Sequence, residues 1–133
     1  MSALDQIGIT VETTSSNGRA LLREIEQRLE RLLTHDEESS IDLSRLPFNP
    51  GDHALLVKTL GEGEVHAEIN SLGPTQVRET AIPGVWWVTH SNADDEVMAE
   101  FIEVTRCPAI MLTPQDDLQD GLEALRVRLL ETE

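Results

Sequence analysis

The architecture follows from two apolar segments joined by a short polar turn: Val85-Trp86-Trp87-Val88-Thr89-His90-Ser91 and Val97-Met98-Ala99-Glu100-Phe101-Ile102-Glu103-Val104. β-branched and aromatic residues dominate both segments, as is typical of strands. Between them, Asn92-Ala93-Asp94-Asp95 supplies turn-forming side chains. The pattern predicts an antiparallel hairpin. Because adjacent side chains of a strand point to opposite faces of a sheet, Trp86 and Trp87 must lie on different faces.

The length of the turn decides which residues share a face with each tryptophan. A connection of two or four residues puts Trp86 with Phe101 and Trp87 with Glu100, and a connection of three reverses the assignment. In either case we expect one ring in the core beside Phe101 and the other ring pointing outward beside Glu100. The outward side also carries Met98 and Ile102. Three roles remain open for the outward ring: it contacts a partner, it forms a homodimer surface, or the first helix or N-terminal segment covers it.

Three helices are expected outside the hairpin. Apolar residues at spacings of three and four indicate the first helix, over residues 21–33. Asn49 as N-cap, Pro50 at the first position and Gly61 after the last turn delimit a second helix. A third helix begins after Pro114. Its apolar side consists of Leu118, Leu122, Leu125 and Leu129.

Residues 65–69 and 77–81 predict two further strands, and residues 41–43 form either a short strand or an apolar anchor in a connector. Helices, then strands, then a closing helix is the order of an α+β protein. We therefore expect a two-layer sandwich with a mainly antiparallel four-stranded sheet, helices packed on one face and the other face open. The length favours a single domain over residues 1–133, with residues 1–17 loosely ordered.

The charge of the chain restricts its partners. Ten Lys and Arg residues against 25 Asp and Glu residues give a net charge of −15. This charge argues against a nucleic-acid binder and against docking on an anionic membrane, and it favours a partner whose contact surface is basic. Cys107 is the single cysteine, so no intramolecular disulfide can form. No signal peptide and no long apolar segment is visible, so we expect a cytoplasmic protein.

Catalytic and metal-binding patterns are absent from the sequence. The four histidines and Cys107 do not have the spacing of a metal site, and no phosphate-binding or nucleophile motif occurs. His66 and His90 can meet only across neighbouring strands, and a solvent-facing His66 is the simpler interpretation. We therefore expect no cofactor, no metal and no enzyme activity. The candidate residues are instead partner-binding: Trp86, Trp87, His90, Asn92, Glu100 and Arg78.

The same hairpin carries a family resemblance. The residues involved are Ile82-Pro83-Gly84-Val85-Trp86-Trp87-Val88, His90, Asn92, Ala99-Glu100-Phe101-Ile102-Glu103-Val104 and Pro108, with Leu72-Gly73-Pro74 and Val77-Arg78-Glu79-Thr80 upstream. Together they resemble the HupH/HyaF hydrogenase expression protein family, from about Leu29 to Leu125 and most strongly between Gly63 and Pro108. The chain is similar to a single-domain version, since many relatives are about twice as long. Where relatives often have glycine in the turn, this chain has Asp95.

The resemblance implies a function as well as a fold. Members of this family are accessory proteins for uptake [NiFe]-hydrogenase assembly, linked to maturation of the iron–sulfur small subunit, and are regarded as chaperone-like scaffolds. The expected partners are therefore the hydrogenase small subunit precursor or other hydrogenase maturation proteins, contacted through the outward tryptophan and the acidic residues near it. The alternative is an acidic homodimeric structural adaptor without client specificity.

Overall fold

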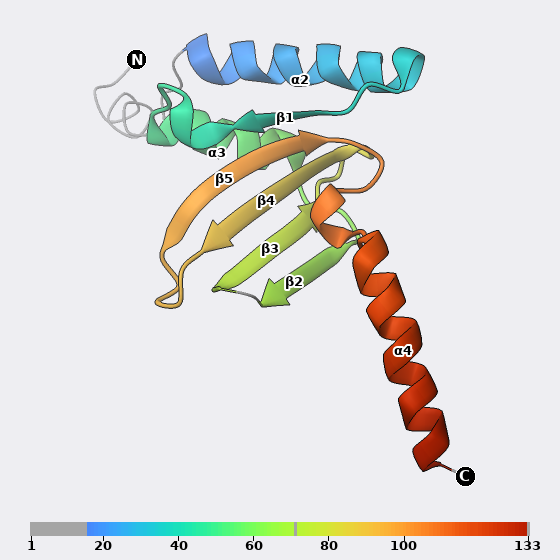
Figure 1. Ribbon diagram of the computed structural model, residues 1–133. Coiled ribbons are helices and arrows are strands. Elements are labelled where there is room, and N and C mark those ends of the chain that lie inside the picture. The colour runs from blue at the N-terminus through green and yellow to red at the C-terminus, as the bar shows by residue number, and fades with distance from the viewer. Residues whose placement is uncertain (1–15, 71, 133) are drawn as a thin grey trace, which may run out of the picture.

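A computed structural model describes residues 16–70 and 72–132 of the chain. In these residues two helices lie on one side of a twisted sheet, and a third helix extends away from it (Figure 1). The elements, in chain order, are α2 (Ser16–His35), β1 (Ser39–Asp42), the 3-10 turn η1 (Leu43–Arg45), α3 (Pro50–Leu60), β2 (His66–Asn70), β3 (Pro74–Glu79), β4 (Val85–Ser91), β5 (Val97–Val104), the 3-10 turn η2 (Ala109–Met111) and α4 (Gln115–Glu131).

The sheet is fully antiparallel, with strand order β1-β5-β4-β3-β2. The predicted α+β class, with helices packed on a sheet, is confirmed. The sheet has five strands instead of four, because residues 39–42 form an edge strand whose Ile41 pairs with Ile102 of β5. This strand ends where the Asp42 carboxylate accepts a hydrogen bond from the backbone N–H of Ser44 (3.0 Å) and thereby caps η1.

Helices α2 and α3 form the layer over β1, β5 and the first residues of β4, Val85 to Trp87. The main core lies between this layer and the sheet, and it consists of Leu21, Ile25, Leu32, Ile41, Leu43, Leu56, Leu60, Val85, Trp87, Ile102 and Val104. The predicted start of α3 is confirmed: Asn49 caps it, with a reciprocal hydrogen bond from the Asn49 backbone to the Asp52 side chain. Gly61 ends it at φ 65°.

Asp52 connects the two helices of this layer. Its side chain is fully buried, and one carboxylate oxygen accepts from the backbone N–H of Gly18 (3.2 Å) near the start of α2. The other oxygen accepts from the backbone N–H of Asn49 (3.1 Å). A single buried carboxylate therefore caps α3 and fixes the beginning of α2 against it.

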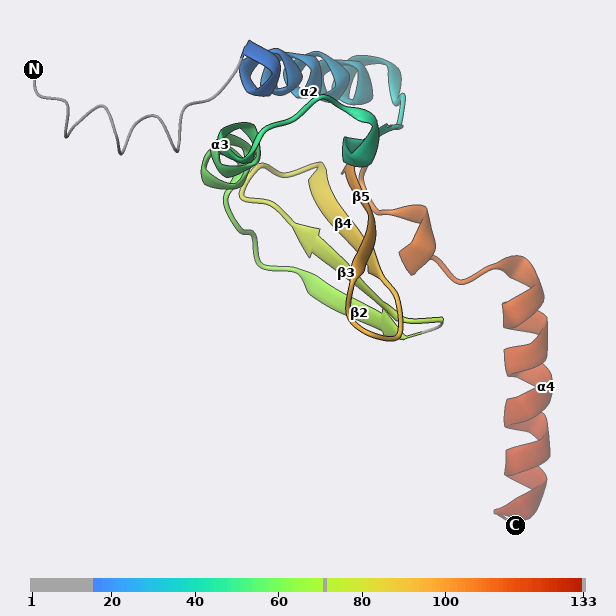
Figure 2. The same cartoon turned by 90° about the vertical axis from the view of Figure 1, so that its left-hand side faces the viewer.

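Of the three predicted helices, α2 and α3 pack on the sheet and the last one, α4, does not. Helix α4 forms where the leucine spacing predicts it, but Figures 1 and 2 show it projecting away from the sheet beyond η2. None of its described residues is buried. The short 3-10 turn η2, for which the sequence shows no clear signal, lies between β5 and α4.

The hairpin register agrees with the even-length alternative. Trp87 pairs with Ile102 and Trp86 pairs with Glu103, so Trp87 shares a face with Glu100 and Trp86 shares a face with Phe101. Five residues connect the paired positions Ser91 and Val97, and a register shift between His90 and Ser91 leaves Met98 as an extra residue in β5. This bulge restores the face assignment that an odd-length connection would reverse.

The turn itself is built by polar side chains. The side-chain oxygen of Asn92 accepts hydrogen bonds from the backbone N–H groups of Asp94 (2.8 Å) and Glu96 (3.0 Å). Asp95 adopts φ 63°, so the aspartate in this turn does occupy the left-handed conformation for which glycine is the usual residue.

Candidate functional site

Both indole rings are buried, which corrects the expectation that one of them faces solvent. Trp86 and Trp87 are each 5% exposed. Of the three roles left open for the ring beside Glu100, cover within the same chain is the correct one, but the helix in contact with Trp87 is α3, through His53, and not the first helix as expected. The expected burial of one ring beside Phe101 is confirmed for Trp86, although the larger core cluster lies on the opposite face of the sheet, under the helices.

Trp86 belongs to a second apolar cluster on the face away from the helices. It packs there with Val77 and Val88, with Phe101 and Met111 alongside. Its ring N–H donates to the backbone carbonyl of Thr105 (3.0 Å). A buried ring whose one polar atom is satisfied inside the chain stabilises the fold and offers no surface to a partner.

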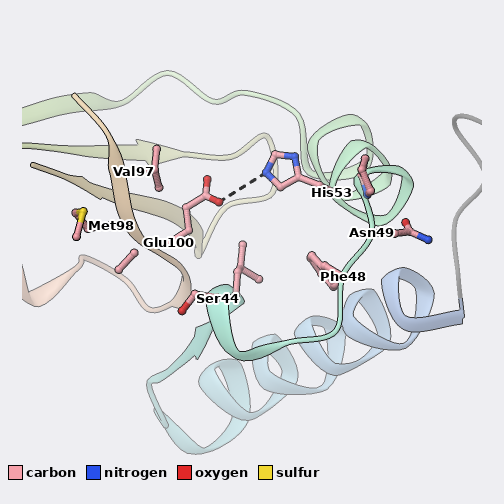
Figure 3. Close-up of a pocket in the computed structure, with 10 residues that line it drawn as sticks. Ser44, Phe48, Asn49, His53, Val97, Met98 and Glu100 are labelled. Carbon is pink, nitrogen blue, oxygen red and sulfur yellow. Dashed lines mark ion pairs between the residues drawn. The ribbon is translucent and has the colours of Figure 1, made fainter. Parts of the chain in front are cut away.

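The strongest candidate for a binding site is a pocket between the helix layer and residues 97–100 of β5, the part of the strand that β1 does not pair with. Its two ionisable side chains are His53, from the first turn of α3, and Glu100, from β5 (Figure 3). The His53 Nε2 and Glu100 Oε1 atoms lie 3.7 Å apart, and the Trp87 ring N–H donates to Glu100 Oε2 (2.8 Å). His53 also lies edge-on to Trp87, with ring centroids 5.4 Å apart.

We call this hollow the His53–Glu100 pocket. Its volume is about 370 Å³, and it is lined by Leu43, Ser44, Phe48, Asn49, Pro50, His53, Val97, Met98, Ala99 and Glu100. Apolar side chains form most of its wall. Val97 is 60% exposed and Met98 is 64% exposed. An apolar wall beside a fixed carboxylate suits a ligand that has an apolar part and a positively charged or hydrogen-bond-donating part.

The pocket lies at an open part of the sheet edge. Strand β1 pairs with residues 101–104 of β5 only, so in the described structure no strand lies against the outer edge of residues 97–100. An unpaired strand edge offers backbone donors and acceptors to an extended peptide. The bulge at Met98 and the acidic residues at 94–96 limit which chains can pair there.

A second, smaller hollow lies on the same face over β2 and β3. It has a volume of about 190 Å³, and its lining includes Arg78, which pairs with His66, and Trp87. The remaining lining residues are Val57, Glu62, Gly63, Val65 and Glu79. Trp87 therefore contributes to both hollows, as a hydrogen-bond donor to Glu100 in one and as part of the wall in the other.

The structure separates the six candidate residues. Trp87, Glu100 and Arg78 lie on the helix-covered face, and Trp86 and His90 lie on the opposite face. His90 Nδ1 lies 2.9 Å from the Thr75 hydroxyl, and its ring is edge-on to Phe101. The sixth, Asn92, holds the hairpin turn.

His53 and Phe48 are the residues that sequence reasoning missed. A signal for His53 exists, because the Asn49 cap and the capping box fix position 53 in the first turn of α3, which packs on the sheet. The sequence does not indicate that β1 stops at Asp42 and leaves room for Phe48 beside the end of β5.

Two carboxyl groups near the pocket and the edge strand have shifted pKa values. Burial, and to a smaller degree the neighbouring Glu38 carboxylate, raise the pKa of Glu103, while His90 acts in the opposite direction. Hydrogen bonds from Ser44 lower the pKa of Asp42, against a partial desolvation effect, with Arg45 adding a smaller lowering contribution. Asp42 is thereby favoured as the charged cap of η1.

No group of three or more His, Cys, Asp or Glu side chains in the described chain is arranged to hold a metal ion. His66 and His90 lie on opposite faces of the sheet with β3 between them, and His66 is hydrogen-bonded to Gln76. Cys107 is half-buried. No helix in the described residues has the length and apolar content that crossing a bilayer requires.

Comparison with known proteins gives the family. Residues 15–131 match the family described as HupH hydrogenase expression protein, C-terminal conserved region. The chain belongs to this HupH family. Its fold is similar to that of the hydrogenase expression protein HupH from Thiobacillus denitrificans ATCC 25259, with a TM-score of 0.84 and 42% identity, over 90% of this chain and 99% of that one. The resemblance stated from the hairpin residues is thus confirmed.

Curated relatives of this HupH-family chain carry related names. The hydrogenase expression/formation protein HupQ of Azotobacter chroococcum mcd 1 is 33% identical over 126 residues, which are 91% of this chain and 43% of that protein. The hydrogenase expression/formation protein HoxQ of Azotobacter vinelandii is 37% identical over 87 residues, 65% of this chain and 31% of that protein. The chain therefore spans less than half the length of these relatives.

Proposed function

We propose that this chain is a non-catalytic accessory protein of hydrogenase maturation that holds an immature polypeptide, the iron–sulfur small subunit precursor of an uptake [NiFe]-hydrogenase, in the cytoplasm. The observation that carries the proposal is the HupH-family match over residues 15–131, which is almost the whole chain. Relatives named hydrogenase expression/formation proteins from several organisms support it.

The binding surface in this proposal is the His53–Glu100 pocket and the open edge of β5 beside it. A segment of the precursor lies extended along residues 97–100, with an apolar side chain against Val97 and Met98. A basic side chain of the same segment reaches the Glu100 carboxylate, which the Trp87 ring N–H holds in place (2.8 Å). Of the six candidates, Glu100 acts as the contact residue and Trp87 acts by positioning it, whereas Arg78 lies in the second hollow, outside this surface.

Charge supports this assignment. The net charge of −15 repels other acidic proteins and attracts a basic segment before contact is made. Asp94, Asp95 and Glu96 are exposed in the hairpin turn next to Val97. An approaching basic segment is thus attracted toward the end of the pocket where its apolar residues can bind.

The test is a binding assay between the purified chain and small-subunit precursor. The variant Val97→Thr/Met98→Gln removes apolar surface from the pocket and adds no charge. We expect it to weaken binding at least about tenfold, since exposed apolar anchors dominate such contacts. A wild-type chain that retains no precursor contradicts the proposal.

The matched control is Leu33→Gln. Leu33 is 80% exposed on α2, outside both hollows, so its replacement removes similar apolar surface elsewhere. We expect unchanged binding. If the control and the pocket variant weaken binding equally, the precursor binds exposed apolar residues non-specifically and the pocket assignment is wrong.

A further inference from the structure

Helix α4 carries an apolar side that the described structure leaves uncovered. Leu118, Leu122, Leu125 and Leu129 are between 50% and 57% exposed, and Figures 1 and 2 show the helix standing clear of the sheet. A helix of 17 residues without tertiary packing has only marginal stability in water. The leucine side therefore needs a surface to pack against.

The spacing of these leucines matches a seam between two helices. They follow one another at intervals of four, three and four residues, which is the heptad pattern of a two-helix coiled coil. At 100° per residue the four side chains fall within a narrow stripe, and Val127 points to the opposite side of the helix. No second apolar stripe of comparable length runs along α4.

The same stripe is self-complementary when two copies of the helix run antiparallel. With Leu118 of one copy level with Leu129 of the other, Leu122 is level with Leu125 of the other, and a two-fold axis relates all four pairs. All four leucines of each helix then lie in the interface. Each pair combines an a position of one helix with a d position of the other, as antiparallel coiled coils require.

Charges on the flanks of the stripe favour this direction. In the antiparallel register Arg126 lies within about 3 Å in height of Glu123 of the second copy, and Arg128 lies equally close in height to Asp117 of the second copy. A parallel arrangement places each of these residues level with its own copy and so brings like charges to the same height. The antiparallel arrangement also opposes the two helix dipoles.

We propose that α4 is a self-association element, which pairs antiparallel with α4 of a second copy of this chain through Leu118, Leu122, Leu125 and Leu129. The interface is small and the chain is strongly acidic, so the dimer forms and dissociates with concentration and is strengthened by salt. This inference is independent of the hydrogenase proposal, since it concerns a different surface.

Sedimentation of the full chain tests the pairing. We expect the mass to rise from 14.8 kDa toward twice that value with increasing protein concentration. Leu122→Asp/Leu125→Asp is expected to raise the dissociation constant at least about a hundredfold, since the seam would have to bury four unpaired charges. Tryptophan fluorescence reports folding of the sheet in the same samples, because both rings are buried away from α4.

Val127→Asp is the matched control. It adds the same charge per substitution at a residue that is 55% exposed on the other side of α4, and we expect the dissociation constant to change less than about threefold. A chain that stays monomeric at every concentration, or a dimer that both variants affect equally, overturns the proposal.

Charge exchange tests the direction. One variant protein carries Arg126→Glu and Arg128→Glu, and a second carries Asp117→Arg and Glu123→Arg. Each alone places like charges across the antiparallel seam and is expected to associate at least about tenfold more weakly than wild type. Mixed together they restore every opposite-charge pair, so a heterodimer at near wild-type affinity is expected. A mixture that associates no better than its components overturns the antiparallel pairing.

Discussion

Trp87 connects the stability of the sheet to the geometry of the pocket. Its ring fills the core under the helices, and its N–H fixes the carboxylate that faces the pocket. The preceding residue, Trp86, fills the apolar cluster on the other face of the sheet, and its ring N–H donates to a backbone carbonyl and so presents no polar group to a ligand. Mutations at the two positions therefore test folding first and binding second.

The size and the hydrogen bond of Trp87 can be separated by two substitutions. Trp87→Ala is expected to destabilise the chain by about 3–5 kcal/mol, because it leaves a large cavity. Trp87→Phe keeps most of the volume and loses the N–H donor to Glu100, at an expected cost of about 1–2 kcal/mol. Urea unfolding measures both, and a Trp87→Ala cost below that of Trp87→Phe contradicts the packing described.

Glu103 gives the fold a pH dependence of defined sign. Its pKa is raised in the folded state, so the folded chain binds a proton more readily than the unfolded chain, and this contribution to stability falls as pH rises from the ordinary value of 4.5 through the raised one. Glu103→Gln removes that contribution. We expect its stability relative to wild type to be more favourable at pH 7 than at pH 4.5, measured by chemical denaturation, and an equal difference at both pH values contradicts the assignment.

Among the elements, α3 holds the pocket together through its first turn. The capping box at Asn49 and Asp52 sets where the helix begins, and His53 follows directly. Because Asp52 also accepts from Gly18, the same turn fixes the angle between α3 and α2.

Asp52→Ala tests this connection. The substitution leaves the backbone N–H groups of Gly18 and Asn49 without their carboxylate partner, so we expect a loss of about 3 kcal/mol in the free energy of unfolding. Calorimetry or urea unfolding measures the loss. An effect no larger than that of an exposed surface substitution, within about 0.5 kcal/mol, shows that the two helices are not tied through this carboxylate.

Local chemistry explains which elements the sequence predicts well. Asn49, Pro50 and Gly61 delimit α3 because capping acts within a few residues. The sequence predicts β4 at its observed bounds because turn-forming residues on both sides of a strand also act locally. The burial of Trp87, in contrast, depends on helices that are distant in the sequence. A signal was nevertheless present, since Val85-Trp86-Trp87-Val88 is a continuous apolar run, typical of a strand buried on both faces.

The position of α4 and the pocket residues were less accessible to prediction. A leucine stripe specifies that a helix has an apolar side, and the same stripe serves a sheet of its own chain or a second helix equally well. The pocket depends on where β1 stops, which a two-residue contact between Asp42 and Ser44 decides. Such short-range competition between strand and 3-10 turn leaves little pattern in the sequence.

On the scale of the whole molecule, the chain carries a net charge of −15 and has an apolar pocket at one edge of the sheet. Its last helix, α4, projects away from the sheet (Figure 2). In our account the two surfaces have separate tasks: the pocket holds a hydrogenase precursor and α4 joins two copies. If the two surfaces are independent, substitutions in the pocket leave self-association unchanged, and substitutions in α4 leave precursor binding unchanged.

Charge steering gives a prediction for the complete chain. If the precursor is drawn in by the net charge of −15, raising the salt concentration from 0.05 M to about 0.5 M is expected to slow association at least about tenfold, with a smaller change in dissociation. Surface-based kinetics measures both rates. An association rate independent of salt contradicts electrostatic steering.

Binding of the precursor at the His53–Glu100 pocket is tested most directly by hydrogen–deuterium exchange of the chain with and without small-subunit precursor. We expect slower exchange at residues 97–100 of β5 and at residues 48–54 around the start of α3, with little change in α2. Exchange that slows elsewhere while both of these segments stay unchanged would contradict binding at the His53–Glu100 pocket.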